Sequence, residues 1–207
     1  MDFFTCFTRE KTRQNNFSSQ NFSVENNYFS ISFLTFSAHE MTHGFDDQGM
    51  MFNLYENEED FLYTNSTMEA FKTSMIHLIQ QYSAYSIDGM KIDGNLTLTE
   101  NIADHGGLHF AEMAYENWLS NNNWSDATLP GFQNLSPQQL FYLGFATPWC
   151  ERHGKLTQER IIQTDTHSPN RFRVNGPLSN SVKFSEAWSC KPGSSMNPKE
   201  KSFIWGK

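Results

Sequence analysis

The sequence contains few cysteines, few basic residues and no long hydrophobic run. Its three cysteines, Cys6, Cys150 and Cys190, include no C-x-x-C pair, which argues against a zinc knuckle held by cysteines. Fifteen Lys and Arg against 23 Asp and Glu give a formal net charge of −8, so the chain lacks the basic face of a nucleic-acid-binding protein. No apolar run approaches the roughly 18 to 20 residues that span a bilayer, and the N-terminus does not read as a signal peptide. We therefore expect no nucleic-acid partner, and neither an export signal nor a membrane helix in this chain.

Aromatic residues are abundant at 15% of the 207 residues, and phenylalanine is the main contributor. A chain of this length forms one domain or a piece of a larger one, and it is long enough to bury a core. The composition predicts a core built more from rings than from aliphatic side chains. Six N-x-S/T sequons permit glycosylation and secretion without proving either, and they begin at Asn16, Asn21, Asn65, Asn95, Asn123 and Asn134.

The first 30 residues differ from the rest of the chain. Residues 1–30 are rich in Asn, Ser, Gln and Phe and show no sustained period, which predicts a divergent, poorly ordered N-terminal segment. Residues 31–207 are then expected to carry the folded domain. From residue 31 the chain turns apolar and then amphipathic, which predicts a helix through His39 and His43 that ends near Gly44.

Apolar residues at helical spacing predict further helices, so the expected fold is mainly α with little β-structure. One helix is expected to begin at Ser66, a second to cover residues 97–119, and a third to begin at Ser136. Shorter helical pieces are expected around 155–163 and 178–188. Capping boxes are predicted at Ser66 with Glu69 and at Ser136 with Gln139. Residues 88–95 are rich in turn formers, which predicts a hairpin or a loop.

The stretch H-E-M-T-H at residues 39–43 carries the first candidate site. On a helix, His39 and His43 lie on one face, so both can point a ring nitrogen at one ion about 2.0–2.1 Å away. Glu40 then stands beside the ion, where a general base for a metal-bound water must be. The alternative is a surface helix with two solvated histidines. By chance, H-E-x-x-H should occur in well under about one in a hundred chains of this length.

A catalytic zinc ion needs a third protein ligand, and the stretch ENIADHGGL offers one. Glu100 and Asp104 share a helix face in this stretch. We predict that Glu100 binds the metal and that Asp104 accepts the ring N–H of His39, which would fix the tautomer of that ligand. The alternative is that Thr97 and Glu100 form a capping box and that Asp104 is solvated.

Six motifs follow one another over residues 36–207 and carry a family resemblance. They are HEMTHGFDDQG, ENIADHGGL, FYLGFATPWC, DTHSPNRFRVNGPLSNS, FSEAWSC and SSMNPKEK. In this order they make the chain similar to the neprilysin family of zinc metallopeptidases, which includes the endothelin-converting enzymes. The resemblance implies a thermolysin-like (zincin) catalytic domain with one zinc ion per chain. It also implies a metalloendopeptidase that hydrolyses short peptides with a zinc-bound water activated by a glutamate.

Eight residues match functional positions of that family. They are the zinc ligands His39, His43 and Glu100, the catalytic base Glu40, the second carboxylate Asp104, the transition-state stabiliser His167, and the substrate contacts Arg173 and Trp149. A second histidine pair at helical spacing, His105 and His109, is expected to be packing or solvated. The alternative for that pair is an adventitious metal site.

The resemblance covers only the C-terminal catalytic portion of the family, so residues 31–207 are expected to be a truncated zinc metallopeptidase domain. Family members are membrane-attached ectodomains with a helical lid. This implies peptide substrates, a cell-surface or extracellular location, and membrane attachment only through a segment absent from this chain. No clear N-A-x-Y edge strand is present, and the family partners of Cys150 and Cys190 lie outside the chain. The alternative function is a non-catalytic zinc-binding fragment or a peptide-binding decoy that lacks the lid.

Overall fold

The structure of the protein is a computed structural model that describes residues 22–52, 63–122 and 132–205, with side chains from residue 31 onward. Its α-helices are α2 (Phe22–Thr42), α3 (Asn65–Ser83), α4 (Leu98–Asn122), α5 (Pro137–Ala146), α6 (Lys155–Thr164), α7 (Asn170–Asn180) and α8 (Val182–Ala187). Short 3₁₀ helices are η1 (His43–Phe45), η2 (Gly49–Met51) and η3 (Thr147–Trp149). The strands β1 (Ser86–Ile87) and β2 (Met90–Lys91) form one hairpin. The prediction of a mainly α fold with little β-structure is confirmed.

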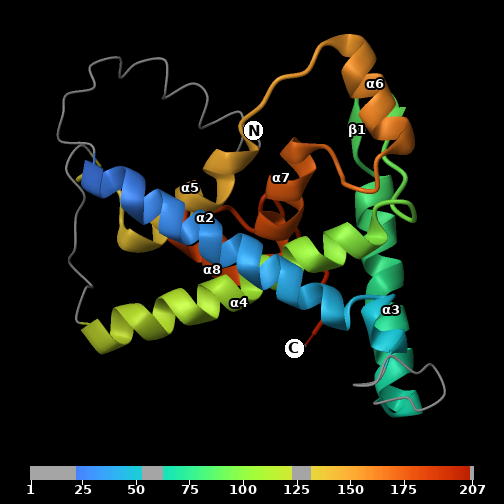
Figure 1. Ribbon diagram of the computed structural model, residues 1–207, viewed down its shortest axis with the longest axis horizontal. Coiled ribbons are helices and arrows are strands. Elements are labelled where there is room, and N and C mark those ends of the chain that lie inside the picture. Colours follow the sequence, from blue (N-terminus) through green and yellow to red (C-terminus); the bar gives the residue numbers. More distant parts are fainter. Residues whose placement is uncertain (1–21, 53–62, 123–131, 206–207) are drawn as a thin grey trace.

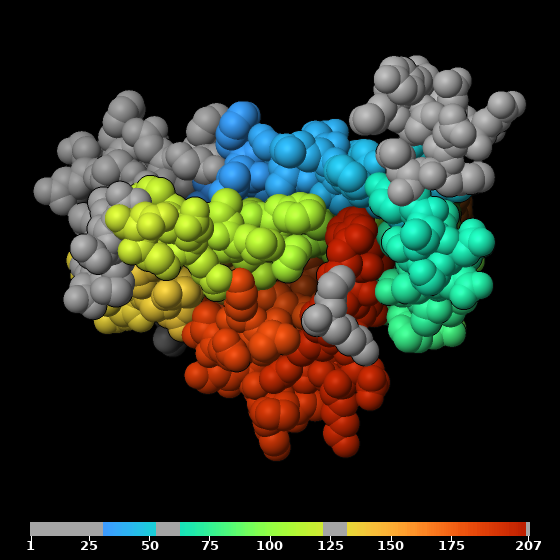
Figure 2. Space-filling view, turned by 90° about the horizontal axis from the view of Figure 1, so that it is seen from below, coloured from blue at the N-terminus to red at the C-terminus, as the bar shows by residue number. Residues whose placement is uncertain are grey.

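The helices α2 and α4 cross in the middle of the molecule and organise the rest of it (Figure 1). Helix α3 stands at one end of this pair, while α5 packs on α2 and α7 packs on α4. A view turned by 90° shows α2 lying along α4, with the C-terminal part of the chain as the next layer (Figure 2). Two segments far apart in the sequence therefore lie side by side at the centre.

Two glycines of α4 allow it to approach α2 closely. A Cβ added at Gly107 would lie 2.9 Å from Thr35 O and 3.1 Å from His39 Cβ. A Cβ added at Gly106 would lie 2.5 Å from the side chain of Thr42. The pair Gly106–Gly107 therefore leaves room for the backbone of α2, and the close crossing brings His39 over the first turns of α4.

Helix α2 begins at Phe22, nine residues before the start predicted for the histidine helix. It ends at Thr42 and continues into η1, close to Gly44, where the end was predicted. The division of the chain at residue 30 stays a prediction, since residues 1–21 lie outside the described residues. The helical backbone of residues 22–30 is nevertheless continuous with the helix that carries the histidines.

The core consists of two clusters, one on each side of the α2–α4 crossing. One joins α5, α7 and α8 to the second half of α4, and the other joins α3, the hairpin and the first half of α4. Seven of the 24 buried hydrophobic residues in the described part are aromatic, so the prediction of a core built mainly from rings is wrong. Several phenylalanines stay at the surface instead, among them Phe33, Phe36 and Phe45.

Two of the local predictions are confirmed and one is wrong. Ser136 and Gln139 form the predicted capping box at the start of α5. The hairpin is also present, with Asp88 and Gly89 in a two-residue turn at positive φ values of 50° and 84°. Helix α3, however, is capped by Thr64, whose hydroxyl accepts the Thr67 N–H at 3.2 Å. Ser66 lies inside the helix, because the chain already turns helical at Asn65.

The C-terminal helices differ most from the prediction. The predicted piece at 178–188 is two helices, α7 and α8, and α7 starts eight residues earlier, at Asn170. Helix α7 contains Gly176 and Pro177, which weaken a helix in isolation. Its burial from Phe172 to Asn180 stabilises it, and a Cβ added at Gly176 would lie 2.1 Å from the Tyr82 hydroxyl. Tertiary packing therefore overrides the local sequence preference here.

Candidate metal centre and active site

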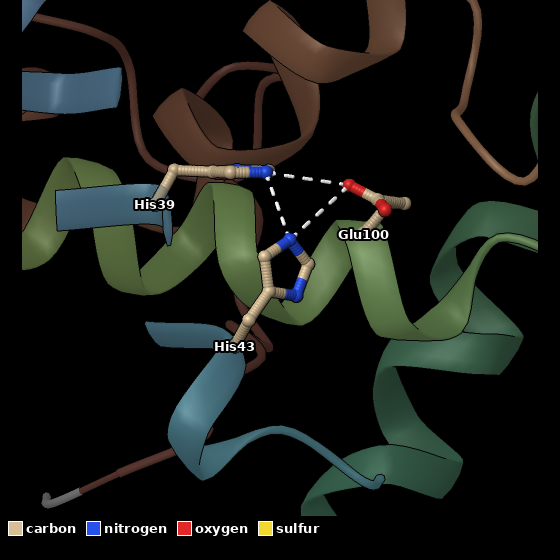
Figure 3. A group of neighbouring side chains, drawn as sticks. All are labelled: His39, His43 and Glu100. Carbon is tan, nitrogen blue, oxygen red and sulfur yellow. Dashed lines mark hydrogen bonds and ion pairs between the residues drawn. The ribbon is translucent and has the colours of Figure 1, made fainter. Parts of the chain in front are cut away.

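The end of α2 brings two imidazoles together. His39 lies in the last turn of α2 and His43 at the start of η1, and their Nε2 atoms are 3.2 Å apart. The rings meet edge to face at an interplanar angle of 89° (Figure 3). The spacing of four residues thus places both Nε2 atoms on the side that faces α4.

Glu100 completes a triangle with the two histidines (Figure 3). Its Oε2 lies 3.3 Å from His39 Nε2 and 3.7 Å from His43 Nε2. A zinc ion bound tetrahedrally at about 2.0–2.1 Å separates its ligand atoms by about 3.4 Å, so the triangle has the size that zinc requires. Oε2 is also buried, and the imidazoles around it lie at ion-pair distance without forming a well-aligned hydrogen bond, so an ion at the centre of the triangle would satisfy it. The residues present therefore fit a zinc ion.

A carboxylate stands behind each imidazole. Asp104 Oδ1 lies 2.9 Å from His39 Nδ1, the contact that the helix spacing predicted. Asp46 Oδ2 lies 2.7 Å from His43 Nδ1, a partner that the sequence reasoning missed. Asp46 accepts the Nδ1–H of His43, and Asp104 faces Nδ1 of His39 at ion-pair distance. A proton on Nδ1 leaves the Nε2 lone pair of each ring available to a metal ion. The signal available in the sequence was an acidic residue three positions after the second histidine.

The charges around His39 favour a cation at its Nε2. Burial lowers the pKa of His39, but Asp104 and Glu100 outweigh burial and raise that pKa to about 9. Burial raises the pKa of Glu100, yet His39 and the nearby His167 hold it below its ordinary value. Burial also raises the pKa of Asp104, and Arg173 and His39 again reverse the direction. Both carboxylates therefore stay anionic around a buried imidazole that holds either a proton or a metal ion.

Arg173, on α7, binds Asp104 with two hydrogen bonds. Its Nε donates to Oδ2 at 2.9 Å and its Nη2 donates to Oδ1 at 2.8 Å. The guanidinium carbon also lies 4.1 Å from the ring centroid of Trp149, as in a cation–π contact. The structure therefore brings both predicted substrate contacts to the site, and it gives Arg173 an additional role as the counter-charge of Asp104.

His167 reaches the same site from the loop between α6 and α7. Its Nε2 lies 3.2 Å from Glu100 Oε2, and its Nδ1 lies 2.9 Å from Asp165 Oδ1. The same Asp165 oxygen accepts the backbone N–H of His167 at 2.8 Å. Asp165 thus orients His167 as Asp104 and Asp46 orient the metal-facing histidines. The sequence reasoning missed Asp165, although it stands only two residues before His167.

The remaining candidate residues are Glu40, His105 and His109, of which Glu40 and His109 are exposed and His105 packs inside the fold. Glu40 is exposed on α2, directly after His39. His105 is a packing residue as expected, with Nδ1 2.7 Å from Asn101 O and Nε2 2.8 Å from Asn180 Nδ2. His109 is exposed, and the metal-sized group found among the described residues contains neither His105 nor His109.

The alternative reading of Glu100 as a capping residue is not supported. Thr97 donates its hydroxyl to Asp93 O at 3.0 Å and accepts the Asn101 side-chain amide at 2.9 Å. Asp104 is only 4% exposed, so it is not solvated. The carboxylate of Glu100 instead faces the two histidines.

A cavity of about 470 Å³ shares His167 with the site. Its walls come from the hairpin, the segment after η3, α6 and the start of α7, and include Ile87, Arg152, Ile161, Asp165, His167 and Arg171. None of the three metal-facing residues lines this cavity. The cavity therefore lies next to the candidate metal centre and reaches it through His167.

The fold and the site together define a class of protein. A helix with H-E-x-x-H crosses a second helix that supplies a glutamate, which is the arrangement that metalloproteases of this motif use. The family model of peptidase family M13 matches residues 5–204. The chain therefore belongs to peptidase family M13, and the predicted resemblance to neprilysin and the endothelin-converting enzymes is confirmed.

Individual relatives agree with this assignment. Endothelin-converting enzyme 1 of Cavia porcellus is 47% identical over 167 residues, which cover 81% of this chain and 22% of that protein. Neprilysin-1 of Caenorhabditis elegans is 40% identical over 169 residues, again 81% of this chain and 22% of that protein. The solved structure of the Mycobacterium tuberculosis zinc metalloprotease Zmp1 in its open state is similar with a TM-score of 0.75 at 30% identity. That match covers 87% of this chain and 28% of the other.

The chain therefore spans about a fifth of the length of these curated relatives. Within the described ranges, no helix combines the length and the apolar character that crossing a membrane requires.

Proposed function

We propose that this chain carries the catalytic centre of a zinc-dependent metalloendopeptidase that hydrolyses peptide bonds in short peptides. The main support is the triangle of His39 Nε2, His43 Nε2 and Glu100 Oε2, with edges of 3.2 to 3.7 Å. A carboxylate behind each imidazole and an exposed glutamate next to His39 support it further. Membership of a peptidase family agrees with this chemistry.

His39, His43 and Glu100 would hold the zinc ion. When bound, zinc supplies a Lewis acid that polarises the scissile carbonyl and makes a water molecule easier to deprotonate. Asp104 and Asp46 keep the two Nδ1 atoms protonated, so that each ligand offers its Nε2 lone pair.

Glu40 and His167 would move and stabilise charge during the reaction. Glu40 takes a proton from the attacking water as the water oxygen bonds to the carbonyl carbon. It then passes this proton to the peptide nitrogen as the carbon–nitrogen bond breaks. His167 donates an N–H from Nε2 to the oxyanion that develops on the carbonyl oxygen. Because Asp165 accepts the Nδ1–H, His167 can donate from Nε2 only while its ring carries both protons.

Arg173 and Trp149 would contact the substrate. The guanidinium has five N–H donors, and its two hydrogen bonds to Asp104 leave others to reach a peptide carbonyl. Trp149 packs 5.1 Å from Phe36, measured between ring centroids, and the two rings offer an apolar wall for the side chain after the scissile bond. Peptide substrates and an extracellular or cell-surface location belong to the same proposal.

The proposal is tested by hydrolysis of a quenched fluorescent peptide with the zinc-loaded chain. Turnover should require zinc and should stop when a chelator removes it. The matched variant Glu40→Gln keeps the size of the side chain and all three ligands, so it should retain zinc but lose at least about a hundredfold in kcat. Undiminished turnover by Glu40→Gln, or no turnover by the folded zinc-loaded chain, would count against catalysis.

One observation favours a second candidate function, namely binding of peptides without cleavage. The two strands of the described residues form a single hairpin, which packs against α3, the first half of α4 and α6. No described strand therefore lies beside α2 to pair with an extended peptide and hold its scissile bond at the metal. Peptide binding by fluorescence anisotropy, together with intact peptide in mass spectra after long incubation, would establish this alternative.

A further inference from the structure

His167 lies at the metal-facing side of the site, but its own contacts do not explain what holds it there. Its Nε2 is 3.2 Å from Glu100 Oε2, while its side chain is 43% exposed. Its other ring contact is with Asp165, two residues away in the same loop. A contact within the loop cannot fix the loop against α4. Another connection must hold the loop beside the first turn of that helix.

The neighbouring residue makes this connection. Ser168 is 2% exposed, and its Oγ donates a hydrogen bond of 2.7 Å to Oδ1 of Asn101. Asn101 directly follows Glu100 and is 1% exposed. The two partners are 67 positions apart in the sequence. The bond therefore joins the residue after His167 to the residue after Glu100. It can thereby control the distance between the side chains of His167 and Glu100.

The orientation of Asn101 is determined by its other partner. The Thr97 hydroxyl donates to Asp93 O at 3.0 Å, so its oxygen accepts from Asn101 Nδ2 at 2.9 Å. The amide oxygen of Asn101 must then face Ser168 as the acceptor. Thr97, Asn101 and Ser168 are all at most 3% exposed, and buried hydrogen bonds in such a chain reinforce one another.

The chain on the other side of Ser168 is also restricted. Pro169 disfavours helical geometry at Ser168 and accepts the Phe172 N–H at 2.7 Å, which starts α7. Further along α7, Arg173 makes its two hydrogen bonds to Asp104. The segment from Ser168 to Arg173 is thus bound to α4 at Asn101 and at Asp104, three residues apart on that helix.

We propose that Asn101 and Ser168 are positioning residues of the peptidase site, because their hydrogen bond holds His167 in register with Glu100. The inference rests on the proposed function, since it assigns a task to the oxyanion-stabilising histidine. Neither residue touches the substrate or the metal. Loss of the bond should let His167 move away from the carbonyl oxygen that it stabilises, and a misplacement of about 1 Å can lower a rate about a hundredfold.

The test compares Ser168→Ala with the zinc-loaded wild-type chain. We expect kcat to fall about tenfold to a hundredfold, while KM changes by less than about threefold and zinc affinity is retained. Ser168→Thr keeps a hydroxyl at this position and should recover most of kcat. Ser185→Ala is the matched control, because it also removes a buried serine hydroxyl, one that donates to Ser181 O and Val182 O at the start of α8. This control should leave kcat within about twofold of wild type.

A double-mutant cycle separates positioning from general stabilisation. If Ser168 acts through His167, then Ser168→Ala should have no further effect on kcat in a His167→Ala background. Equal losses of kcat in both backgrounds would overturn the proposal, as would a loss of zinc affinity that parallels the loss of kcat. Should Ser168→Ala not fold, the isosteric change Thr97→Val weakens the same hydrogen-bonded chain at its other end and takes its place in the cycle.

A measurement independent of activity distinguishes failure of this inference from failure of the proposed function. The imidazole ¹⁵N signals of His167, recorded by NMR in the metal-free chain, should shift or broaden in Ser168→Ala and stay unchanged in Ser185→Ala. A wild-type chain that binds zinc but cleaves no peptide would contradict the proposed function only. Signals of His167 that are the same in Ser168→Ala as in wild type would contradict the positioning role.

Discussion

Each of the three histidines of this site is paired with a carboxylate that faces its Nδ1. Asp104 stands behind His39, Asp46 behind His43 and Asp165 behind His167, at 2.7 to 2.9 Å. The carboxylate decides which ring nitrogen carries the proton, and therefore which nitrogen is left to bind. Two of these three carboxylates come from positions near their histidine in the sequence, and Asp104 comes from the neighbouring helix.

The first prediction concerns Asp46. In Asp46→Asn, the Oδ1 contacts to the Gln48 and Gly49 N–H groups can persist, but the amide nitrogen replaces the acceptor of the His43 Nδ1–H. The His43 ring would then favour the tautomer with a proton on Nε2, so zinc affinity should fall about tenfold to a hundredfold. Competition with a chelating dye measures this. Asp47→Asn at the adjacent position is the control, and a larger loss there than in Asp46→Asn would contradict the assignment.

The second prediction concerns pH. Below a pH of about 9 the Nε2 of His39 holds a proton in the zinc-free chain, because Asp104 and Glu100 raise its pKa. Zinc must displace that proton, so its apparent affinity should increase with pH and level off as the pH passes about 9. The same raised pKa stabilises the zinc-free fold below the ordinary pKa of 6.5, and this contribution should fade as the pH rises toward 9.

Zinc titrations between about pH 6 and pH 9 test the pH prediction, with calorimetry in buffers of different ionisation enthalpy to count the released protons. Affinity that is constant over this range would contradict it. His109→Ala removes an exposed histidine outside the metal group and should leave the pH dependence unchanged.

At the scale of secondary structure, the site depends on the crossing of α2 with α4. The two histidines belong to the end of α2 and to η1, whereas Glu100 and Asp104 belong to α4. Gly106 and Gly107 set how closely these helices approach, since a Cβ at either would meet α2 at 3.0 Å or less. The distances between the three ligand atoms therefore depend on how closely the two helices pack.

Gly107→Ala should separate the helices and weaken zinc binding. The added methyl group meets Thr35 O and His39, so the unfolding free energy should fall by about 1–3 kcal/mol as in other overpacked cores. Zinc affinity should fall with it, because His39 moves away from Glu100. Gly154→Ala is the control, because its new Cβ would meet nothing within 4 Å and its φ of −69° suits alanine. Thermal unfolding and zinc titration of both variants check the prediction.

At the scale of the whole molecule, a bound ion would add a further link between two layers that already meet through packing and through the contacts of His39 with Asp104 and Glu100. One layer contains α2 and η1, and the other is α4 with the C-terminal helices behind it (Figure 2). A ligand that binds only the folded state stabilises it by about 2.7 kcal/mol at a hundredfold excess over its Kd. Zinc should therefore raise the melting temperature of the chain.

The melting temperature should increase with zinc concentration in the wild-type chain. In Glu100→Gln, which keeps the size of the side chain but removes the charge of the third ligand, the increase should be much smaller. Glu116→Gln, a change at an exposed position of the same helix, should behave as the wild type does. A melting temperature that zinc leaves unchanged would argue that the triangle is not a metal site.

The sequence by itself determined those features that depend on residues three or four positions apart. The period of 3.6 residues places His39 beside His43, and Glu100 near Asp104, on one helix face wherever that helix lies in the fold. Capping chemistry likewise predicted the start of α5 at Ser136, because the box needs only residues three positions apart. These predictions succeeded because helix geometry alone brings the partners together.

Only the tertiary structure decided which of these local groups meet. The close crossing at Gly106 and Gly107 brings His39 to Glu100, and the burial of α7 stabilises a helix whose Gly176 and Pro177 argue against it. The hydrogen bond between Asn101 and Ser168 joins positions 67 residues apart, which no helical or strand period relates. Such contacts depend on how the helices pack, because packing sets the distance between residues that the chain itself does not hold together.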